Sequence, residues 1–315
     1  MATLQPQLSS ALDQASPPAV IAGPKGWKRR LEDPFNTYYR YPVALVITRL
    51  LMHTPVTPNQ VSLVQPLFAA VAGYAVTFDD WRYHVFAVAV FEVRSILDCV
   101  DGSLARAKRL SSPNGHAIDG IADWLGVVFL YLGLFHYLYH HPPMGVSSLV
   151  AVGVAAAALG QGAIRSASSD YFKSKYIGIY ERQKDDAPTI LRDKLLALKP
   201  GAPIFGYADA FILWGTHLLF ELERFDAQKT KPLSPAAVAH MVEREGSLQT
   251  RVTAFLWSIS SGDAFLSFVV VSILVGQIWP VQVFFASFGT LWIGLFILYN
   301  VRFLRAQRRV DASAV

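Results

Sequence analysis

The stretch from Asp98 to Asp123 reads DCVDGSLARAKRLSSPNGHAIDGIAD and places four aspartates at the ends of two apolar runs. Asp98 and Asp101 are three residues apart and Asp119 and Asp123 are four apart, so each pair shares one face of a predicted helix. A charged side chain at the bilayer centre costs about 2.5–3.5 kcal/mol, so packing alone does not account for four of them. Two facing helices would gather the four carboxylates, and a divalent metal ion is the usual way to keep such a group ionised.

The composition indicates a polytopic membrane protein. Of 315 residues, 53% are hydrophobic and 16% are charged, whereas an ordinary soluble domain has about 25% charged residues. The mean hydropathy is +0.33. Cys99 is the single cysteine of the sequence, so no intrachain disulfide is possible, and we interpret it as a small apolar filler between two aspartates.

Six apolar runs each approach the roughly 20 residues that a spanning helix needs, at 60–78, 84–107, 116–140, 146–169, 254–277 and 280–303. The expected fold is therefore all-α, a bundle of six transmembrane helices. Helical spacing of apolar residues between 34 and 52 predicts an amphipathic helix at the membrane surface before the first span. Thr57 and Pro58 supply a cap and a first turn for that span.

The remaining segments divide the chain. Residues 1–24 are rich in Pro, Ser, Gln and Ala and fit neither a signal nor a transit peptide, so we expect a disordered N-terminal tail, which we extend to residue 33. A membrane domain is expected over 34–305, with a cytosolic insertion at about 173–252. A C-terminal tail is expected over 306–315.

Basic residues indicate the orientation. With six spans, nearly all Lys and Arg fall in segments on one side, whereas the opposite loops at 79–83, 140–145 and 277–280 carry Arg82 alone. A seventh apolar run at 204–220 would reverse the later segments if it crossed, so we assign it to the insertion. We therefore expect an integral, multi-pass protein whose active site faces the cytosol, in a bacterial plasma membrane or the endoplasmic reticulum.

The central stretch follows the pattern D-x2-D-G-x2-A-R-x8-G-x3-D-x3-D at every defined position and gap. In this motif the chain resembles the CDP-alcohol phosphotransferase family, over roughly residues 34–170 and 255–305. The resemblance implies direct transfer of a phosphoalcohol group from a CDP-linked donor to a hydroxyl acceptor, with release of CMP and two Mg²⁺ or Mn²⁺ ions. It implies Asp98, Asp101 and Asp119 as metal ligands and Asp123 as both ligand and general base. It also implies a homodimer.

The other motif residues suit a nucleotide. Gly102 and Ala105 are small and leave the helix backbone approachable, although packing between membrane helices explains small residues equally well outside this pattern. Arg106 can bind a phosphate through two parallel hydrogen bonds, and Gly115 permits close approach where the second helix begins. The resemblance adds Asn59 to this CDP-binding set.

Two further arginines have alternative interpretations. Arg165, with Lys173, could bind an acidic acceptor, although anchoring at the cytosolic face explains the same residues. Arg94 lies one turn before Asp98 and could neutralise the acidic cluster, or pair with Glu92 or another buried acid.

The substrates stay open at this stage. The small N-terminal region and Arg165 favour CDP-diacylglycerol as donor, and hence phosphatidyl transfer within phospholipid synthesis. The alternative is a CDP-choline or CDP-ethanolamine:diacylglycerol phosphotransferase, and an intramembrane prenyltransferase or a cation transporter is more distant. The expected partners are a CDP-linked lipid or alcohol, a hydroxyl acceptor and membrane lipids, with no nucleic acid.

Overall fold

The computed structural model describes residues 26–110, 113–197 and 232–312, and within these ranges every regular element is a helix. The N-terminal elements are α2 (Gly26–Leu31), the π-helix η1 (Asn36–Arg40) and α3 (Tyr41–Leu51). The long helices that follow are α4 (Pro58–Val76), α5 (Trp81–Lys108), α6 (Pro113–His140) and α7 (Ser148–Arg182). Then come α8 (Ala187–Ala197), α10 (Pro235–Glu243), α11 (Leu248–Ile259), α12 (Gly262–Leu274), α13 (Ile278–Phe284), the π-helix η2 (Phe285–Gly289) and α14 (Thr290–Ala312).

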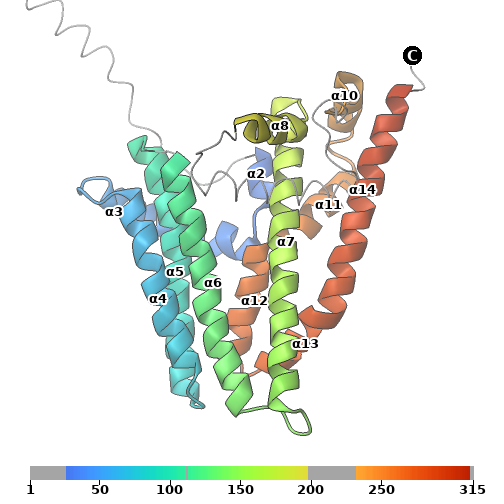
Figure 1. The fold of residues 1–315 in the computed structure, drawn as a ribbon. Coiled ribbons are helices and arrows are strands. Elements are labelled where there is room, and N and C mark those ends of the chain that lie inside the picture. The colour runs from blue at the N-terminus through green and yellow to red at the C-terminus, as the bar shows by residue number, and fades with distance from the viewer. Residues whose placement is uncertain (1–25, 111–112, 198–231, 313–315) are drawn as a thin grey trace, which may run out of the picture.

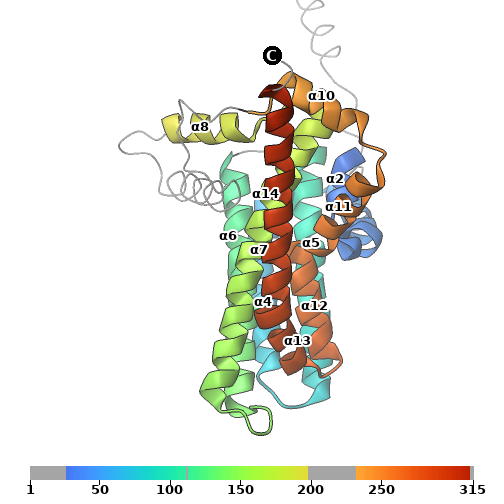
Figure 2. The same ribbon diagram turned by 90° about the vertical axis from the view of Figure 1, so that its right-hand side faces the viewer.

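The long helices run along one common direction. Figure 1 shows α4, α5 and α6 together on the left, with α7, α12 and α14 on the right, and Figure 2 shows the same alignment from the side. α4 packs along both α5 and α6. Gly73 and Gly133 make the α4–α6 crossing possible, because a Cβ on Gly133 would overlap the Gly73 carbonyl.

One of the apolar clusters formed by the described residues joins the two halves. Tyr131 of α6, Phe265 of α12 and Phe285 of η2 belong to one cluster of buried side chains, and the Tyr131 and Phe265 rings stack with centroids 6.4 Å apart. The motif-bearing helices therefore pack against the C-terminal half of the chain.

The prediction of an all-α fold is confirmed for the described residues, but six spans are not evident among them. Of the described helices, three segments are long and apolar enough to cross a membrane: Ile118–His140, Ser148–Arg182 and Ile278–Gln307. The pair Leu248–Ile259 and Gly262–Leu274 makes a fourth if its 50° bend lies within one span. The expected run at 254–277 is thus broken, and Ser261 caps the second piece by accepting a hydrogen bond from the Ala264 amide (3.1 Å).

The helices α4 and α5 are long but contain too many polar residues to qualify as spans by composition. α4 opens with Pro58-Asn59-Gln60 and also carries Gln65, and α5 holds Glu92 and Arg94 besides two aspartates. α4 nevertheless packs along both α5 and α6, so it joins the two helices (Figure 1). The chain has the helices of a multi-pass membrane protein, and the aspartate motif lies on α5 and α6.

Two segments expected as tails contain helix. Residues 26–31 form α2, in which Trp27 and Leu31 are buried. Residues 306–312, expected as a C-terminal tail, continue α14 to Ala312. The predicted helix over 34–52 is confirmed as η1 followed by α3.

The insertion is helical where it is described. α7 extends to Arg182, and α8, α10 and α11 follow it, with α8 and α10 at the end of the bundle where α14 finishes (Figure 1). The run at 204–220 lies outside the described residues.

Candidate functional site

Three of the four motif aspartates form one compact group. Asp98 of α5 and Asp119 and Asp123 of α6 each offer a carboxylate oxygen, and these oxygens lie within 4.8 Å of one another. Helical periodicity puts Asp119 and Asp123 on one face of α6, and the ion pair between Arg94 and Asp123 links that face to α5. Carboxylate oxygens are the ligands that Mg²⁺ and Mn²⁺ prefer, so the residues present fit the divalent metal implied by the motif.

Asp101 is held by α4 instead. Its Oδ2 accepts hydrogen bonds from the Ser62 hydroxyl (2.6 Å) and the Gln65 amide nitrogen (2.7 Å), and its side chain is buried. Asp101 is absent from the group of three just described. Ser62 and Gln65 lie outside the sequence motif, so the motif did not predict their contact with Asp101. The available signal was that both are polar residues on one face of an apolar helix.

A cavity of about 320 Å³ joins the aspartates to the rest of the motif. Its walls include the five residues expected to bind CDP and two of the aspartates: Asn59, Asp101, Gly102, Ala105, Arg106, Gly115 and Asp119. Residues up to 60 positions apart in the chain thus line the same cavity, as a nucleotide-binding site requires. Ser62 and Lys28 also line it, although neither residue belongs to the motif.

The junction beside this cavity is fixed by Lys108. Its ammonium donates to the carbonyl oxygens of Thr54 (2.7 Å) and Val56 (2.8 Å), just before α4. Thr57 then caps α4 with a reciprocal capping box that includes Gln60. These contacts set where α4 begins, and hence where Asn59 enters the cavity wall.

Arg94 reaches the aspartates from deeper in the bundle. Its guanidinium forms an ion pair with Asp123, and Arg94 is only 5% exposed. Gly126 of α6 makes room for it, because a Cβ there would lie 2.9 Å from the Arg94 Nε. The side chain of Asp123 remains 46% exposed, so this carboxylate is paired on one side and open on the other. Of the two readings of Arg94, the structure supports contact with the acidic cluster.

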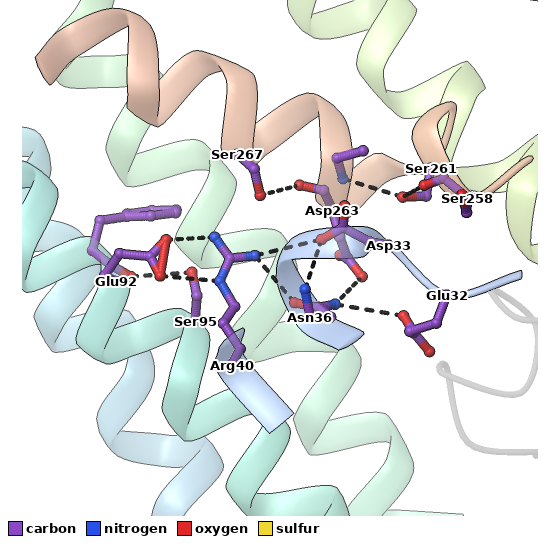
Figure 3. Close-up of polar contacts among 12 residues, drawn as sticks. Glu32, Asp33, Asn36, Arg40, Glu92, Ser95, Ser258, Ser261, Asp263 and Ser267 are labelled. Carbon is purple, nitrogen blue, oxygen red and sulfur yellow. Dashed lines mark hydrogen bonds and ion pairs between the residues drawn. The ribbon is translucent and has the colours of Figure 1, made fainter. Parts of the chain in front are cut away.

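Glu92 is engaged by a different arginine. Arg40 of η1 donates from Nε to Glu92 (3.0 Å) and from Nη1 to the side-chain oxygen of Asn36 (3.1 Å). Asn36 in turn donates to Asp263 Oδ2 of α12 (2.9 Å), and its backbone amide donates to Asp33 (3.1 Å). Figure 3 shows this network joining the N-terminal segment to α5 and α12. It fixes residues 33–40 beside the aspartate-bearing helix.

Arg165 and Lys173, expected to contact the acceptor, lie elsewhere on α7. Arg165 is 4% exposed, donates to the Gly289 carbonyl oxygen (3.3 Å) and lies over the Phe285 ring (5.4 Å). Lys173 lies in electrostatic range of Asp170 on the same helix. Neither residue is in the wall of the cavity as formed by the described part of the chain. The structure thus adds no support for their acceptor role.

Comparison with known proteins points to lipid synthesis. A family profile described as ceramide phosphoethanolamine synthase matches residues 27–166, which include all of α2 except Gly26 and all of the motif. The ceramide phosphoethanolamine synthase of Drosophila melanogaster is 32% identical over an alignment of 133 residues, which covers 39% of this chain and 34% of the fly protein. The chain therefore matches about a third of that relative's length. The likeness is to a lipid synthase and is confined to the half of the chain that holds the aspartates.

Proposed function

We propose that the chain is a membrane lipid synthase of the CDP-alcohol phosphotransferase type. It transfers phosphoethanolamine from CDP-ethanolamine to a hydroxyl group of a lipid acceptor, ceramide being the first to test, and releases CMP. The observation that carries the proposal is the cavity that joins the compact carboxylate group to the small and basic residues of the motif. The likeness to ceramide phosphoethanolamine synthase moves the proposed donor away from CDP-diacylglycerol.

The proposed reaction is a single displacement at phosphorus. The acceptor hydroxyl oxygen forms a bond to the phosphorus that bears ethanolamine, and the bond from that phosphorus to the CMP oxygen breaks. The proton of the hydroxyl passes to the carboxylate of Asp123, which is open to solvent on one side. Divalent ions, when bound, would offset the negative charge on the transferred and leaving phosphates.

The remaining residues would bind and orient. Asp98, Asp119 and Asp123 would hold the metal through one shared space. Asp101, kept in place by Ser62 and Gln65, would complete the ligand set from the cavity wall. Asn59, Gly102, Ala105 and Gly115 would admit the nucleotide, and Arg106 would pair with a phosphate.

The proposed topology keeps six spans. α4 and α5 would cross beside α6, with their polar side chains turned to the bundle interior, where buried Gln65 and Asp101 already meet. The basic residues of the loops and of α14 would place the aspartate end of the bundle at the cytosolic face.

The test is reconstitution with a matrix of substrates. Purified protein in nanodiscs is supplied with Mn²⁺, with CDP-ethanolamine, CDP-choline or CDP-diacylglycerol, and with ceramide, diacylglycerol or glycerol phosphate. CMP release and product lipids are measured by chromatography and mass spectrometry. We expect CMP and ceramide phosphoethanolamine in equal amounts, from CDP-ethanolamine and ceramide only.

A matched variant separates chemistry from folding. Asp123→Asn should lose at least about 100-fold in rate while the protein stays folded, since it changes one oxygen to nitrogen at the site of proton transfer. Product from CDP-diacylglycerol would overturn the donor assignment. Release of no CMP with any pair would overturn the proposed reaction.

A further inference from the structure

The cavity has one wall residue from outside the motif-bearing helices. Lys28 lies on α2, 73 residues before Asp101 in the sequence, yet it lines the same cavity of about 320 Å³. Among the residues that line it, Lys28 and Arg106 are the cations, facing a space that also contains Asp101 and Asp119. The Arg106 guanidinium already donates to the Ser103 hydroxyl (3.2 Å).

α2 is too short to hold this lysine by itself. A helix of six residues is unstable in isolation, so its position depends on tertiary contacts. Trp27 supplies them: its indole stacks on Tyr180 of α7 with centroids 4.0 Å apart, and its Nε1 donates to Glu245 (2.9 Å). Its backbone amide donates to Glu181 (2.6 Å). Trp27 is 4% exposed, next to a lysine that is exposed.

The other end of the segment is also fixed. Leu31 is buried in the same apolar cluster as Trp27, and Asn36 and Arg40 are tied to α12 and α5 through Asp263 and Glu92. Lys28 therefore lies on a segment, residues 27–40, that is held in place by contacts at both ends. Within the described residues, the Lys28 ammonium makes no ion pair or hydrogen bond, whereas the nearby Arg30 is paired with Glu245 (2.9 Å).

We propose that Lys28 is a phosphate-binding residue of this cavity, delivered by α2 and positioned by Trp27. The inference rests on the proposed function and adds a cation from outside the motif to the nucleotide-diphosphate side of the site. A flexible ammonium on a docked helix suits this role, because it can follow the phosphate between the bound donor and the leaving CMP. Lys28 makes electrostatic contact only, so no bond is formed or broken through it.

The neighbouring Arg29 provides a matched control. It carries the same charge on the same helix, but it lines a different cavity, of about 1090 Å³, between α2 and α11. Any effect of general positive charge at this surface would appear in Arg29→Ala and Lys28→Ala alike. An effect confined to Lys28 would reflect its place in the donor cavity.

The experiment measures binding of CDP and CMP to full-length protein in nanodiscs with Mn²⁺, by calorimetry. We expect Lys28→Ala to weaken CDP binding about tenfold, as for loss of one charge-assisted contact, and Lys28→Arg to restore most of it. CMP binding should weaken less, because CMP lacks the second phosphate. Arg29→Ala should bind within twofold of wild type.

A double-mutant cycle tests the positioning by Trp27. Trp27→Ala should also weaken CDP binding, and the double variant Trp27→Ala/Lys28→Ala should bind no more weakly than Lys28→Ala alone. Additive losses would overturn the role of Trp27, and an unchanged affinity in Lys28→Ala would overturn the proposal as a whole. If wild-type protein binds no cytidine nucleotide, the proposed function fails first. If it binds and transfers while Lys28→Ala equals Arg29→Ala, the inference about Lys28 alone fails.

Discussion

The guanidinium of Arg94 is paired with the carboxylate of Asp123 across the α5–α6 interface. Arg94 is buried and Asp123 is half-exposed, so the pair fixes the orientation of the carboxylate while leaving one side of it accessible. Because Asp123 is the proposed base, the arginine acts on the reaction through the position of that carboxylate.

Removing this cation should slow the chemical step. We expect Arg94→Gln to lower kcat by about 10- to 100-fold with less than a threefold change in the KM for the donor, since its loss would leave the proposed base misplaced. The measurement is steady-state CMP release. A change confined to KM would show that Arg94 serves binding instead.

The space that Gly126 leaves for Arg94 can be tested separately. Gly126→Ala would place a Cβ 2.9 Å from the Arg94 Nε, so we expect an intermediate loss of kcat. Gly120→Ala is the matched control on α6, because a Cβ there meets nothing within 4 Å. Equal losses in both variants would mean that α6 tolerates no added methyl group, and the Arg94 explanation would fall.

Metal binding should depend on the compact carboxylate group. We expect Asp98→Asn and Asp119→Asn each to weaken Mn²⁺ binding at least about tenfold, because each removes one charged ligand. The measurement is electron paramagnetic resonance of free Mn²⁺. Chelation should abolish CMP release, and added Mn²⁺ should restore it. Asp79→Asn is the control, since this carboxylate accepts from Tyr137 (3.1 Å) outside the motif. Wild-type Mn²⁺ affinity in Asp119→Asn would contradict the assignment.

The α4–α6 crossing should be intolerant of added volume. Gly133→Ala would drive a methyl group into the Gly73 backbone, and overpacking of this kind costs about 1–3 kcal/mol. We expect a clear fall in melting temperature in detergent. Gly153→Ala, on the neighbouring α7, meets nothing within 4 Å and should melt as wild type does. If both variants melt alike, the crossing is looser than its geometry indicates.

Asp33 should make stability depend on pH. Burial is the main cause that raises the pKa of its carboxyl from 3.8 to about 6, so the folded state binds this proton more tightly than the unfolded chain. Its contribution to stability is fully present below about pH 4 and is lost as the pH rises through about 6. Asp33→Asn avoids that loss and keeps an oxygen to accept from the Asn36 amide.

The variant should therefore gain stability over wild type at pH 7.5, by at most about 3 kcal/mol, and the gain should shrink towards pH 4.5. Melting temperatures of both proteins across this pH range provide the check. A difference that does not vary with pH would show that Asp33 does not titrate in this way.

The sequence by itself determined which residues share a helix face and which helices are apolar. The motif predicted a cluster of four carboxylates, and the structure groups three of them, Asp98, Asp119 and Asp123. Helical periodicity accounts for Asp119 and Asp123, because residues four apart on one helix are neighbours whatever the rest of the fold does. The approach of Asp98 on α5 to this pair on α6 depends on how the helices pack.

Only the tertiary structure decided which partners the charged residues take. From the sequence, Arg94 could have paired with an acid on its own helix or with one on a neighbouring helix. In the structure it pairs with Asp123 of α6, where Gly126 leaves room for its side chain, and Glu92 pairs with Arg40. The sequence alone placed Lys28 in the N-terminal tail. In the structure Trp27 stacks on Tyr180, and Lys28 lines the cavity. Such contacts join segments tens to hundreds of residues apart, and their choice depends on how whole helices pack and on which apolar surfaces they bury, which no local spacing encodes.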